Sequence, residues 1–236
     1  MTILISEISN CHMGSMTKAK QLIKAAHESG ADLIKGQAFV YADVAKYGSM
    51  PIEFYKQCQL NVWECEELID YARSIGSDMF FSIFSKEFEI IESMQNYSKF
   101  SAAQTKELQT SKTKICDSDK DNIFMSVNDV NSFREKSHGY YFEKTKLMYA
   151  TDYMEDDTHK VVTNVALIAE QAATYGLSDH SLGIDNCIDA VIDFDAEIIE
   201  KHFTLEKNVT FKGKIFRDTV HGATPKEFEQ LAKAIK

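Results

Sequence analysis

Two histidines lie at the ends of apolar runs, where they could share one metal ion. His180 lies in GLSDHSLGI (residues 176–184), and His202 follows AEIIEK in the run at residues 196–203. Two neutral imidazoles, completed by water or substrate oxygens, suit a divalent ion such as Mn²⁺, Zn²⁺ or Co²⁺. Ordinary turn residues after two strands would show the same spacing, so a metal pair and a structural role both remain open.

The other five histidines fall into two groups. His12 and His221 are candidates for the same site as the first pair. His27 lies on a helix-like segment, and His138 and His159 lie in polar segments. These surroundings are typical of surface histidines.

Two lysines lie within strand-like runs and could bind an anion. Lys35 lies in DLIKGQ and Lys99 in YSKFS. An ammonium group that points into an enclosed site needs an anion nearby, and phosphate or carboxylate is the natural ligand. The hydroxyls of Ser126 and Ser178 could add donors. In the alternative, both lysines lay their aliphatic stems along the surface and keep the ammonium group in water.

Strand-like and helical segments alternate along the chain and set where these side chains lie. Periodicity predicts strands at 3–8, 31–39, 77–84, 97–102, 122–127, 145–151, 177–181 and 196–203. Helices are expected at 15–30, 61–76, 85–94, 159–176, 186–194 and 224–236. Asn61 is an expected N-cap, Thr224 and Pro225 begin the last helix, and Gly176 is an expected helix stop. The polar stretch 104–121 predicts a loop or a reduced helix.

Eight strands, most of them followed by a helix, predict an α/β fold, a compact (β/α)8 TIM barrel that occupies residues 1–236 as a single domain. An open doubly wound sheet is the alternative, although no G-x-G-x-x-G follows the first strand. In a barrel, the C-terminal strand ends meet at one mouth, where barrel enzymes keep their active sites. Those ends supply Glu7, Lys35, Gln37, Ser82, Lys99, Ser126, Thr151, Tyr153, Ser178, Asp179, His180 and His202. So many polar groups at one mouth indicate a bound ligand.

Composition excludes some classes of partner. The net charge of −10 argues against binding to nucleic acid or to an acidic membrane surface. Five scattered cysteines without a CxxC motif predict reduced thiols and a cytoplasmic protein. Neither a signal peptide nor an apolar run long enough to span a bilayer is expected.

Four segments resemble the N-acetylneuraminate (sialic acid) synthase family. They are SEISNCHMGSMTKAKQLIKAAHESGADLIKGQAF, YGLSDHSLGI, AEIIEKHFTLEK and PKEF. The resemblance implies a catalytic (β/α)8 barrel without the family's small C-terminal antifreeze-like domain, and a homodimer is one assembly that it suggests. It further implies a transferase that condenses phosphoenolpyruvate with an N-acylated amino-sugar aldehyde, such as N-acetylmannosamine. The products would be phosphate and a nine-carbon 2-keto sugar acid such as N-acetylneuraminate.

The same resemblance implies roles for individual residues. His180 and His202 would bind a divalent metal, Mn²⁺ before Mg²⁺, Co²⁺ or Zn²⁺, which polarises the aldehyde. Lys35 and Lys99 match anion-binding lysines, and Glu7 matches an acid near the aldehyde and the attacking water. Substrate-binding positions fall on Gln37, Ser82, Gln104, Ser126, Tyr153, Ser178 and Asp218.

The chain also departs from the family pattern. Ala102, Ala103 and Gln104 stand where the family has Ser-Gly-Glu, and Thr151 stands where it has asparagine. Cys11 replaces the asparagine before His12, and GKIFRDTVHG keeps Asp218 without a histidine beside it. These departures favour one alternative, a catalytically impaired member that binds phosphoenolpyruvate, phosphate or a sugar without turnover. Another alternative is a barrel aldolase or lyase that uses Lys35 or Lys99 as a Schiff base.

Overall fold

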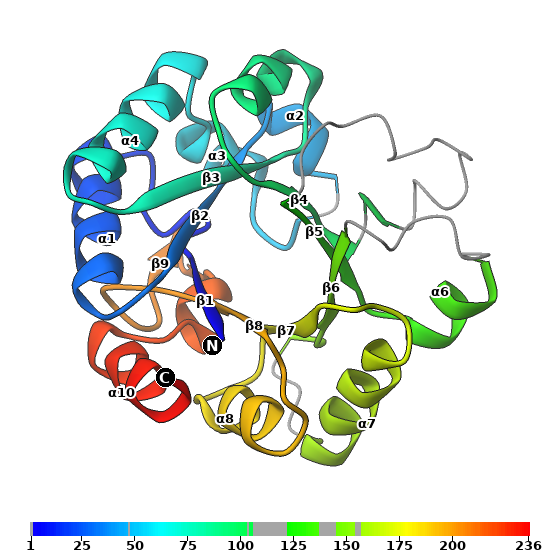
Figure 1. Ribbon diagram of the computed structural model, residues 1–236. Helices are drawn as coiled ribbons and strands as arrows, with labels where there is room; N and C mark the ends of the chain where they lie inside the picture. Colours follow the sequence, from blue (N-terminus) through cyan, green and yellow to red (C-terminus); the bar gives the residue numbers. More distant parts are fainter. Residues whose placement is uncertain (1, 47, 103, 106–121, 137–144, 154–156) are drawn as a thin grey trace.

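Eight parallel strands form one sheet that curls almost into a closed ring, with helices on its outer side (Figure 1). The computed structural model describes residues 2–46, 48–102, 104–105, 122–136, 145–153 and 157–236. The strand order is β3-β2-β1-β8-β7-β6-β5-β4, so neighbours are consecutive in the chain except where the first strand pairs with the last. This is the order of a barrel. The predicted (β/α)8 fold is confirmed, and the open doubly wound alternative is wrong.

All eight predicted strands are present in the described residues. They are β1 Ile3–Glu7, β2 Leu33–Ala38, β3 Asp78–Ile83, β4 Ser98–Phe100, β5 Ile123–Val127, β6 Thr145–Ala150, β7 Tyr175–Asp179 and β8 Ile198–His202. A short antiparallel hairpin, β9 Thr210–Phe211 and β10 Lys214–Ile215, follows the last barrel strand.

Most of the predicted helices are present as well. The described helices are α1 Met16–Glu28, α2 Tyr41–Val44, α3 Ile52–Cys58, α4 Val62–Ser74, α6 Val130–Lys136, α7 Thr158–Ala169, α8 Asp185–Ile192, α9 Asp218–His221 and α10 Pro225–Ile235. Capping boxes at Asn61 and Thr224 confirm both predicted N-caps. Residues 86–93 form a 3₁₀ helix, η1, and the prediction for 104–121 lies almost wholly outside the described residues. Among those residues, no helix has the length and apolar character needed to cross a membrane.

Two alternating layers fill the barrel. The lower layer consists of Ile5, Leu33, Phe80, Phe124, Met148 and Ile198, which pack against one another inside the ring. Side chains two residues apart on a strand point to the same face. The residues two positions further along most of these strands are Glu7, Lys35, Ser82, Ser126 and Glu200, so a polar layer lies directly above the apolar one. A ligand of the polar layer therefore enters from the C-terminal end of the strands.

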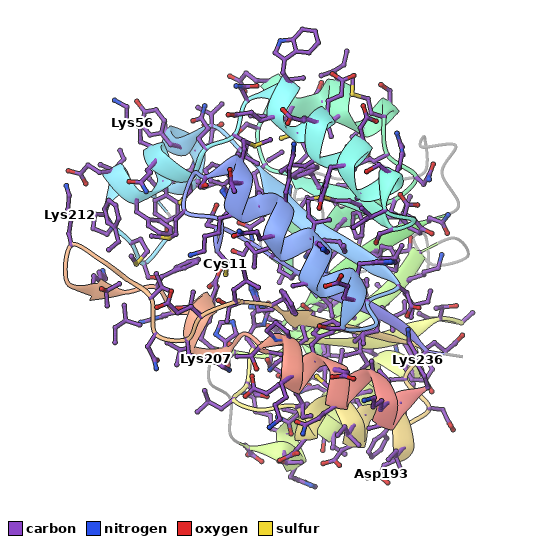
Figure 2. All side chains as sticks on the ribbon, turned by 90° about the vertical axis from the view of Figure 1, so that its left-hand side faces the viewer. Cys11, Lys56, Asp193, Lys207, Lys212 and Lys236 are labelled. Carbon is purple, nitrogen blue, oxygen red and sulfur yellow. The ribbon has the colours of Figure 1, made fainter. Side chains whose placement is uncertain are left out.

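The wall of this mouth is raised on one side by α3 and the β9–β10 hairpin. Lys56 of α3 and Lys212 of the hairpin lie at the same end of the barrel, opposite Lys236 (Figure 2). Phe54 of α3 packs against the rings of Phe211 and Phe216, with centroids 5.5 and 4.8 Å away. This aromatic cluster fixes the hairpin, and with it the segment that leads into α9.

The ring has a seam between β3 and β4, which lie side by side without a backbone ladder. At this seam the Gln95 side chain accepts a hydrogen bond from the Phe81 N–H at 2.8 Å and donates one to the Phe81 carbonyl at 3.1 Å. The amide thus takes the place that a peptide group of a neighbouring strand would occupy. This satisfies the buried backbone of β3 where pairing stops.

The prediction of Gly176 as a helix stop is wrong. Helix α7 ends at Ala169, and Gly176 is the second residue of β7, paired with Ile198 of β8. A Cβ atom at Gly176 would lie 1.9 Å from the Ile198 carbonyl oxygen. The glycine therefore serves the close approach of two strands and not the end of a helix.

We expect Gly176→Ala to lower the free energy of unfolding by roughly 4 kcal/mol or more, because the new methyl group meets backbone that cannot move aside. Gly76→Ala is the matched control: Gly76 has a φ of +81° but open space at the Cβ position. The control should cost about 1–2 kcal/mol from backbone strain alone. Chemical denaturation of both variants measures the difference, and equal losses would contradict the steric explanation.

Candidate active site

Four buried charged groups form a network in the polar layer. The Lys35 ammonium lies 2.7 Å from a Glu7 carboxylate oxygen and 2.9 Å from a Glu200 oxygen. The Lys99 ammonium lies 3.2 and 3.3 Å from the two oxygens of Glu200. Both lysines are buried, so the alternative of ammonium groups in solvent is wrong. The network joins β1, β2, β4 and β8 across the barrel.

Two serine hydroxyls complete this network. Lys99 donates a hydrogen bond to the Ser126 hydroxyl at 2.7 Å, and the Ser178 hydroxyl donates one to Glu200 at 2.8 Å. Both serines are buried. Ser126 thus lies beside Lys99 and Ser178 beside Glu200, and their role as donors to a bound anion stays a prediction.

The two buried lysines differ in pKa. Burial alone would lower the pKa of Lys35, but the carboxylates of Glu200 and Glu7 raise it above its usual range. Burial lowers the pKa of Lys99 to about 8, assisted by the neighbouring Lys35 and opposed by Glu200. Burial opposes ionisation of Glu200, yet the two ammonium groups hold its pKa below the usual range. Burial raises the pKa of Glu7. Lys35 and Glu200 are thus permanent charges, whereas Lys99, with a pKa of about 8, can exchange a proton near neutrality.

Glu200 is the member of this network that the sequence prediction missed. The sequence predicted that a bound anion from outside the protein would neutralise the two lysines. In the structure both lysines pair with the Glu200 carboxylate. A signal existed: Glu200 lies two residues before His202 on a strand, so the two side chains share a face. Lys201, between them, points outward and pairs with Asp179 at 2.5 Å. For the same reason Asp179 lines neither cavity described below, although its strand end was expected at the mouth.

Three histidine rings gather above the charged network. The ring centroids of His180 and His202 are 5.1 Å apart, and the His221 ring lies 4.7 Å from His202 and 5.6 Å from His180. His180 Nδ1 lies 3.0 Å from the Thr151 carbonyl oxygen, an acceptor that holds the proton on Nδ1 and leaves Nε2 as the free ligand atom. His12, by contrast, accepts a hydrogen bond from the Gly14 N–H and supports a turn.

These rings are neutral at physiological pH. Burial lowers the pKa of His180 to about 4 and that of His221 to about 3. The pKa of His202 lies well below its usual value because of burial and the two neighbouring histidines. A neutral imidazole is the form that binds a metal ion. The donor set therefore fits a divalent cation without a proton having to leave first.

Asp218 lies beside the histidines at the start of α9. Its carboxylate accepts a hydrogen bond from the Ser9 hydroxyl at 2.5 Å and lies 3.8 Å from His202 Nδ1. Burial, with a smaller effect of Glu7, raises its pKa to about 7. One ligand atom each of His202, Asp218 and His221 lies within 4.8 Å of the others, all three residues being buried.

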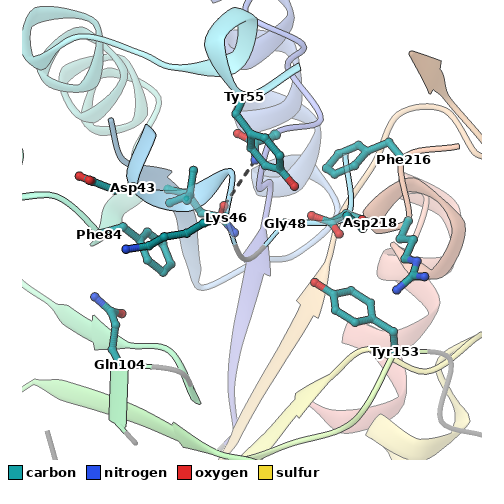
Figure 3. A pocket seen from close by; sticks show the side chains of 14 residues that line it. Asp43, Lys46, Gly48, Tyr55, Phe84, Gln104, Tyr153, Phe216 and Asp218 are labelled. Atoms are coloured by element: carbon teal, nitrogen blue, oxygen red, sulfur yellow. Dashed lines mark hydrogen bonds between the residues drawn. The ribbon is translucent and has the colours of Figure 1, made fainter. Parts of the chain in front are cut away.

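Two adjoining cavities open at this mouth. The inner cavity has a volume of about 330 Å³, and its walls include Glu7, Lys35, Ser82, Lys99, Ser126, Ser178, His180, Glu200 and His202. The outer cavity has a volume of about 540 Å³, and its walls include Asn10, Asp43, Lys46, Tyr55, Gln104, Phe216, Arg217 and Asp218. In Figure 3 Asp43, Lys46 and Phe84 face Phe216, Asp218 and Tyr153 across the outer cavity. Gln37, Phe84 and Tyr153 line both spaces.

All twelve residues to which the resemblance gives a role line at least one of these cavities, whereas the further candidates His12, Asp179 and His221 line neither. Gln104 lines the outer one, but its amide already donates to the Ile83 carbonyl at 2.6 Å and accepts from the Ser101 N–H. Tyr153 is half exposed, and its ring lies 5.2 Å from the rings of both His180 and His221. The guanidinium group of Arg217 lies over the Tyr153 ring, 5.9 Å from its centroid. The wall formed by α2 and α3 was not predicted, because these short helices carry too few periodic positions.

The ring of eight parallel strands, with its ionisable groups gathered above an apolar layer, defines a TIM-barrel protein. The chain belongs to the NeuB family, whose model matches residues 22–236.

Individual relatives agree with this assignment. A pseudaminic acid synthase of Helicobacter pylori is 25% identical over 256 residues, which span 99% of this chain and 73% of that protein. An uncharacterized protein of Methanocaldococcus jannaschii is 27% identical over 249 residues, which span 100% of this chain and 70% of the relative. The crystal structure of N-acetylneuraminic acid synthetase from Leptospira borgpetersenii, in complex with citrate, matches 99% of this chain and 82% of that one. Its TM-score is 0.78 at 20% identity, a likeness of fold.

Proposed function

We propose that the chain is a transferase that condenses phosphoenolpyruvate with an N-acylated amino-sugar aldehyde. The products are phosphate and a nine-carbon 2-keto sugar acid. The observation that carries this proposal is the pair of adjoining cavities with different chemistry. The inner one has two ammonium groups and several hydroxyls, among them those of Ser82, Ser126 and Ser178, for a small, highly charged anion, and the outer one has the size and mixed lining of a sugar site. The names of the pseudaminic acid and N-acetylneuraminic acid synthases among its relatives support the same reaction class.

Phosphoenolpyruvate is assigned to the inner cavity. Lys35 and Lys99 supply positive charge there, and Ser82, Ser126 and Ser178 supply hydroxyl groups. Charge-assisted hydrogen bonds of this kind are the strong ones in anion sites. Glu200 holds both ammonium groups in place and offsets part of their positive charge. The acceptor sugar is assigned to the outer cavity, with Gln37, Gln104, Tyr153 and Asp218 facing its hydroxyl and amide groups.

The reaction requires one new carbon–carbon bond and one broken carbon–oxygen bond. C3 of phosphoenolpyruvate attacks the aldehyde carbon, and the aldehyde oxygen takes up a proton to become a hydroxyl. Water adds at C2, and the resulting tetrahedral intermediate loses phosphate through cleavage of the C2–O bond. Glu7, with its raised pKa and its place between Lys35 and the Ser9 N–H, carries the proton from that water to the aldehyde oxygen.

The residues at the mouth fit a divalent metal ion. His180 and His202 would hold it, since His180 keeps Nε2 free and His202 Nδ1 has no hydrogen-bond partner. When bound there, the ion would supply Lewis-acid polarisation of the acceptor carbonyl. Mn²⁺ is the first expectation for two imidazoles completed by oxygens, with Mg²⁺, Co²⁺ and Zn²⁺ as alternatives.

A phosphate-release assay tests this function. Purified protein with Mn²⁺ and phosphoenolpyruvate should release phosphate only when an aldose acceptor is added, and a panel of N-acylated amino sugars should identify the acceptor. Tight binding of phosphoenolpyruvate without turnover on the whole panel would support the impaired, binding-only alternative. Ala102 and Gln104, in place of the family's serine and glutamate, are the residues that favour it.

A Schiff-base aldolase is the second candidate, and one observation favours it. The lowered pKa of Lys99, about 8, is typical of an activated amine. However, the Lys99 ammonium group forms hydrogen bonds with Glu200 and Ser126. These contacts stabilise its charged form, which suits an anion-binding lysine better than a nucleophilic amine. Borohydride trapping of a substrate on Lys99 would favour the aldolase, and its absence during turnover would favour the condensation.

The pKa of Lys99 predicts a pH dependence of anion binding. Burial lowers this pKa to about 8, so the lysine of the free protein loses its charge as pH rises through 8. Phosphoenolpyruvate affinity should therefore fall by roughly 16-fold from pH 8 to 9.5, and by about tenfold for each further pH unit. Calorimetric titration at several pH values measures this. In Lys99→Arg the guanidinium stays charged, so its profile should be flat over the same range. A wild-type profile as flat as that of the arginine variant would contradict the prediction.

A further inference from the structure

We infer that His221 is a third protein ligand of the metal site, which makes the site a cluster of three imidazoles with the Asp218 carboxylate beside them. This inference rests on the proposed metal site at His180 and His202 and adds a residue to it. A three-histidine site differs from a two-histidine site in affinity and in the metals that it prefers. Both properties can be measured without turnover.

The first support is the arrangement of the rings. His221 lies closer to His202 than His180 does, with centroids 4.7 Å apart and ring planes at 90°. One ligand atom of His221, His202 and Asp218 lies within 4.8 Å of the others. Two ligands of one ion at bond lengths of about 2.1 Å are separated by at most about 4.2 Å, so a small inward movement of the side chains closes the site.

The second support is the set of nitrogens without a partner. His221 is 1% exposed, and neither of its ring nitrogens has a hydrogen-bond partner; His202 Nδ1 has none either. A buried polar group without a partner costs roughly 1–3 kcal/mol. Three such nitrogens within one cluster would be costly for a purely structural packing of aromatic rings. A shared cation would satisfy His202 Nδ1 and one of the two His221 nitrogens.

The third support is the backbone that holds His221 in place. Asp218 and His221 are the two ends of the single turn α9, three residues apart, which puts both on one side of the turn. The segment after it is tied to the end of β8, since the Ala223 N–H donates to the His202 carbonyl at 2.6 Å and the Thr204 N–H donates to the Ala223 carbonyl. The backbone of one ligand strand thus anchors the turn that carries the other two groups.

The chemical consequence is a shift in metal preference. Three imidazoles favour Zn²⁺ and Co²⁺ over the oxygen-seeking Mn²⁺ and Mg²⁺, and three protein ligands leave a further position for an acceptor oxygen. We therefore expect tighter binding of Co²⁺ and Zn²⁺ than of Mn²⁺, and His221→Ala should remove most of the difference.

Cobalt titration of the metal-free protein tests the inference. Wild type should bind one Co²⁺ with the visible spectrum of a nitrogen- and oxygen-ligated ion. His221→Ala should weaken binding by at least about 100-fold, since loss of outer partners alone weakens metal sites by roughly 10–100-fold. His221→Cys keeps a ligand atom at the position, and it should bind Co²⁺ with a new near-ultraviolet band from thiolate-to-cobalt charge transfer. His159→Cys, at an exposed position on α7, is the matched control and should show no such band. Melting of the metal-free variants checks that they fold.

The outcomes separate this inference from the proposed function. Unchanged Co²⁺ affinity in His221→Ala, together with loss in His180→Ala and His202→Ala, overturns the third ligand and leaves the proposed function standing. Absence of the charge-transfer band in folded His221→Cys, or absence of any Co²⁺ binding by wild type, also overturns it. Metal binding that depends on all three histidines, without acceptor-dependent phosphate release, supports the inference and contradicts the proposed function.

Discussion

Replacement of either His180 or His202 by alanine should abolish acceptor-dependent phosphate release, with a loss of at least about 1,000-fold in kcat. His202 is buried and His180 is half-buried at the mouth of the barrel, and the two rings, 5.1 Å apart, line the cavity assigned to phosphoenolpyruvate. Each substitution removes one of the nitrogens that would hold the ion polarising the aldehyde. Metal content after dialysis against Mn²⁺ should fall together with the rate.

The control for this prediction is His159→Ala, which changes an exposed histidine on α7. Its rate and its metal content should equal those of wild type. Phosphoenolpyruvate affinity provides a second check, because Lys35 and Lys99 remain in place in both histidine variants and binding of the anion should survive. Full activity in His180→Ala or His202→Ala would show that neither ring serves the reaction.

The substitution Glu200→Gln should lower the free energy of unfolding by about 3–5 kcal/mol, the usual cost of breaking a buried ion pair. Glu200 neutralises both lysines, with Lys35 at 2.9 Å and Lys99 at 3.2 Å. In the variant Lys35 keeps Glu7, whereas Lys99 loses the carboxylate that opposes its burial. Chemical denaturation at neutral pH measures the loss.

Added inorganic phosphate should restore part of this stability, because a bound anion can replace the lost carboxylate beside Lys99. The gain should exceed the gain of wild type at the same phosphate concentration. Asp179→Asn is the matched control. It breaks the other buried pair, with Lys201 at 2.5 Å, on the outer side of the sheet away from both cavities. It should be destabilised to a similar degree but gain no more from phosphate than wild type does. An equal phosphate effect in the two variants would contradict an anion site at Lys99.

Periodicity was sufficient to predict the barrel because each strand is a short apolar run with turn residues on both sides. The two capping boxes, at Asn61 and Thr224, involve residues three apart in the chain, so local sequence predicts them as well. Gly176 shows the limit of such local reasoning. Its role depends on Ile198, a partner 22 residues away that only the sheet register brings close.

The site shows the same division between local and long-range information. Lys35 and His202 were predicted because each ends or interrupts an apolar strand. Glu200 was missed because the residues around it predict only a strand. Its two lysine partners lie on β2 and β4, far from it in the sequence. His221 was only one of several candidates, since its place beside His202 depends on the turn α9 and on the backbone contact with β8. The roles of such residues can be recognised only from the three-dimensional structure, in which distant strands of the barrel lie side by side.

The fate of the bridging oxygen of phosphoenolpyruvate tests the central claim most directly. Wild-type protein is given phosphoenolpyruvate labelled with ¹⁸O between C2 and phosphorus, together with the active aldose, and both products are analysed by mass spectrometry. The proposed condensation predicts that the label leaves with phosphate and that the organic product has the mass of the acceptor plus one pyruvic acid. Label retained in free pyruvate, formed at the same rate without the aldose, would show simple hydrolysis and contradict the account.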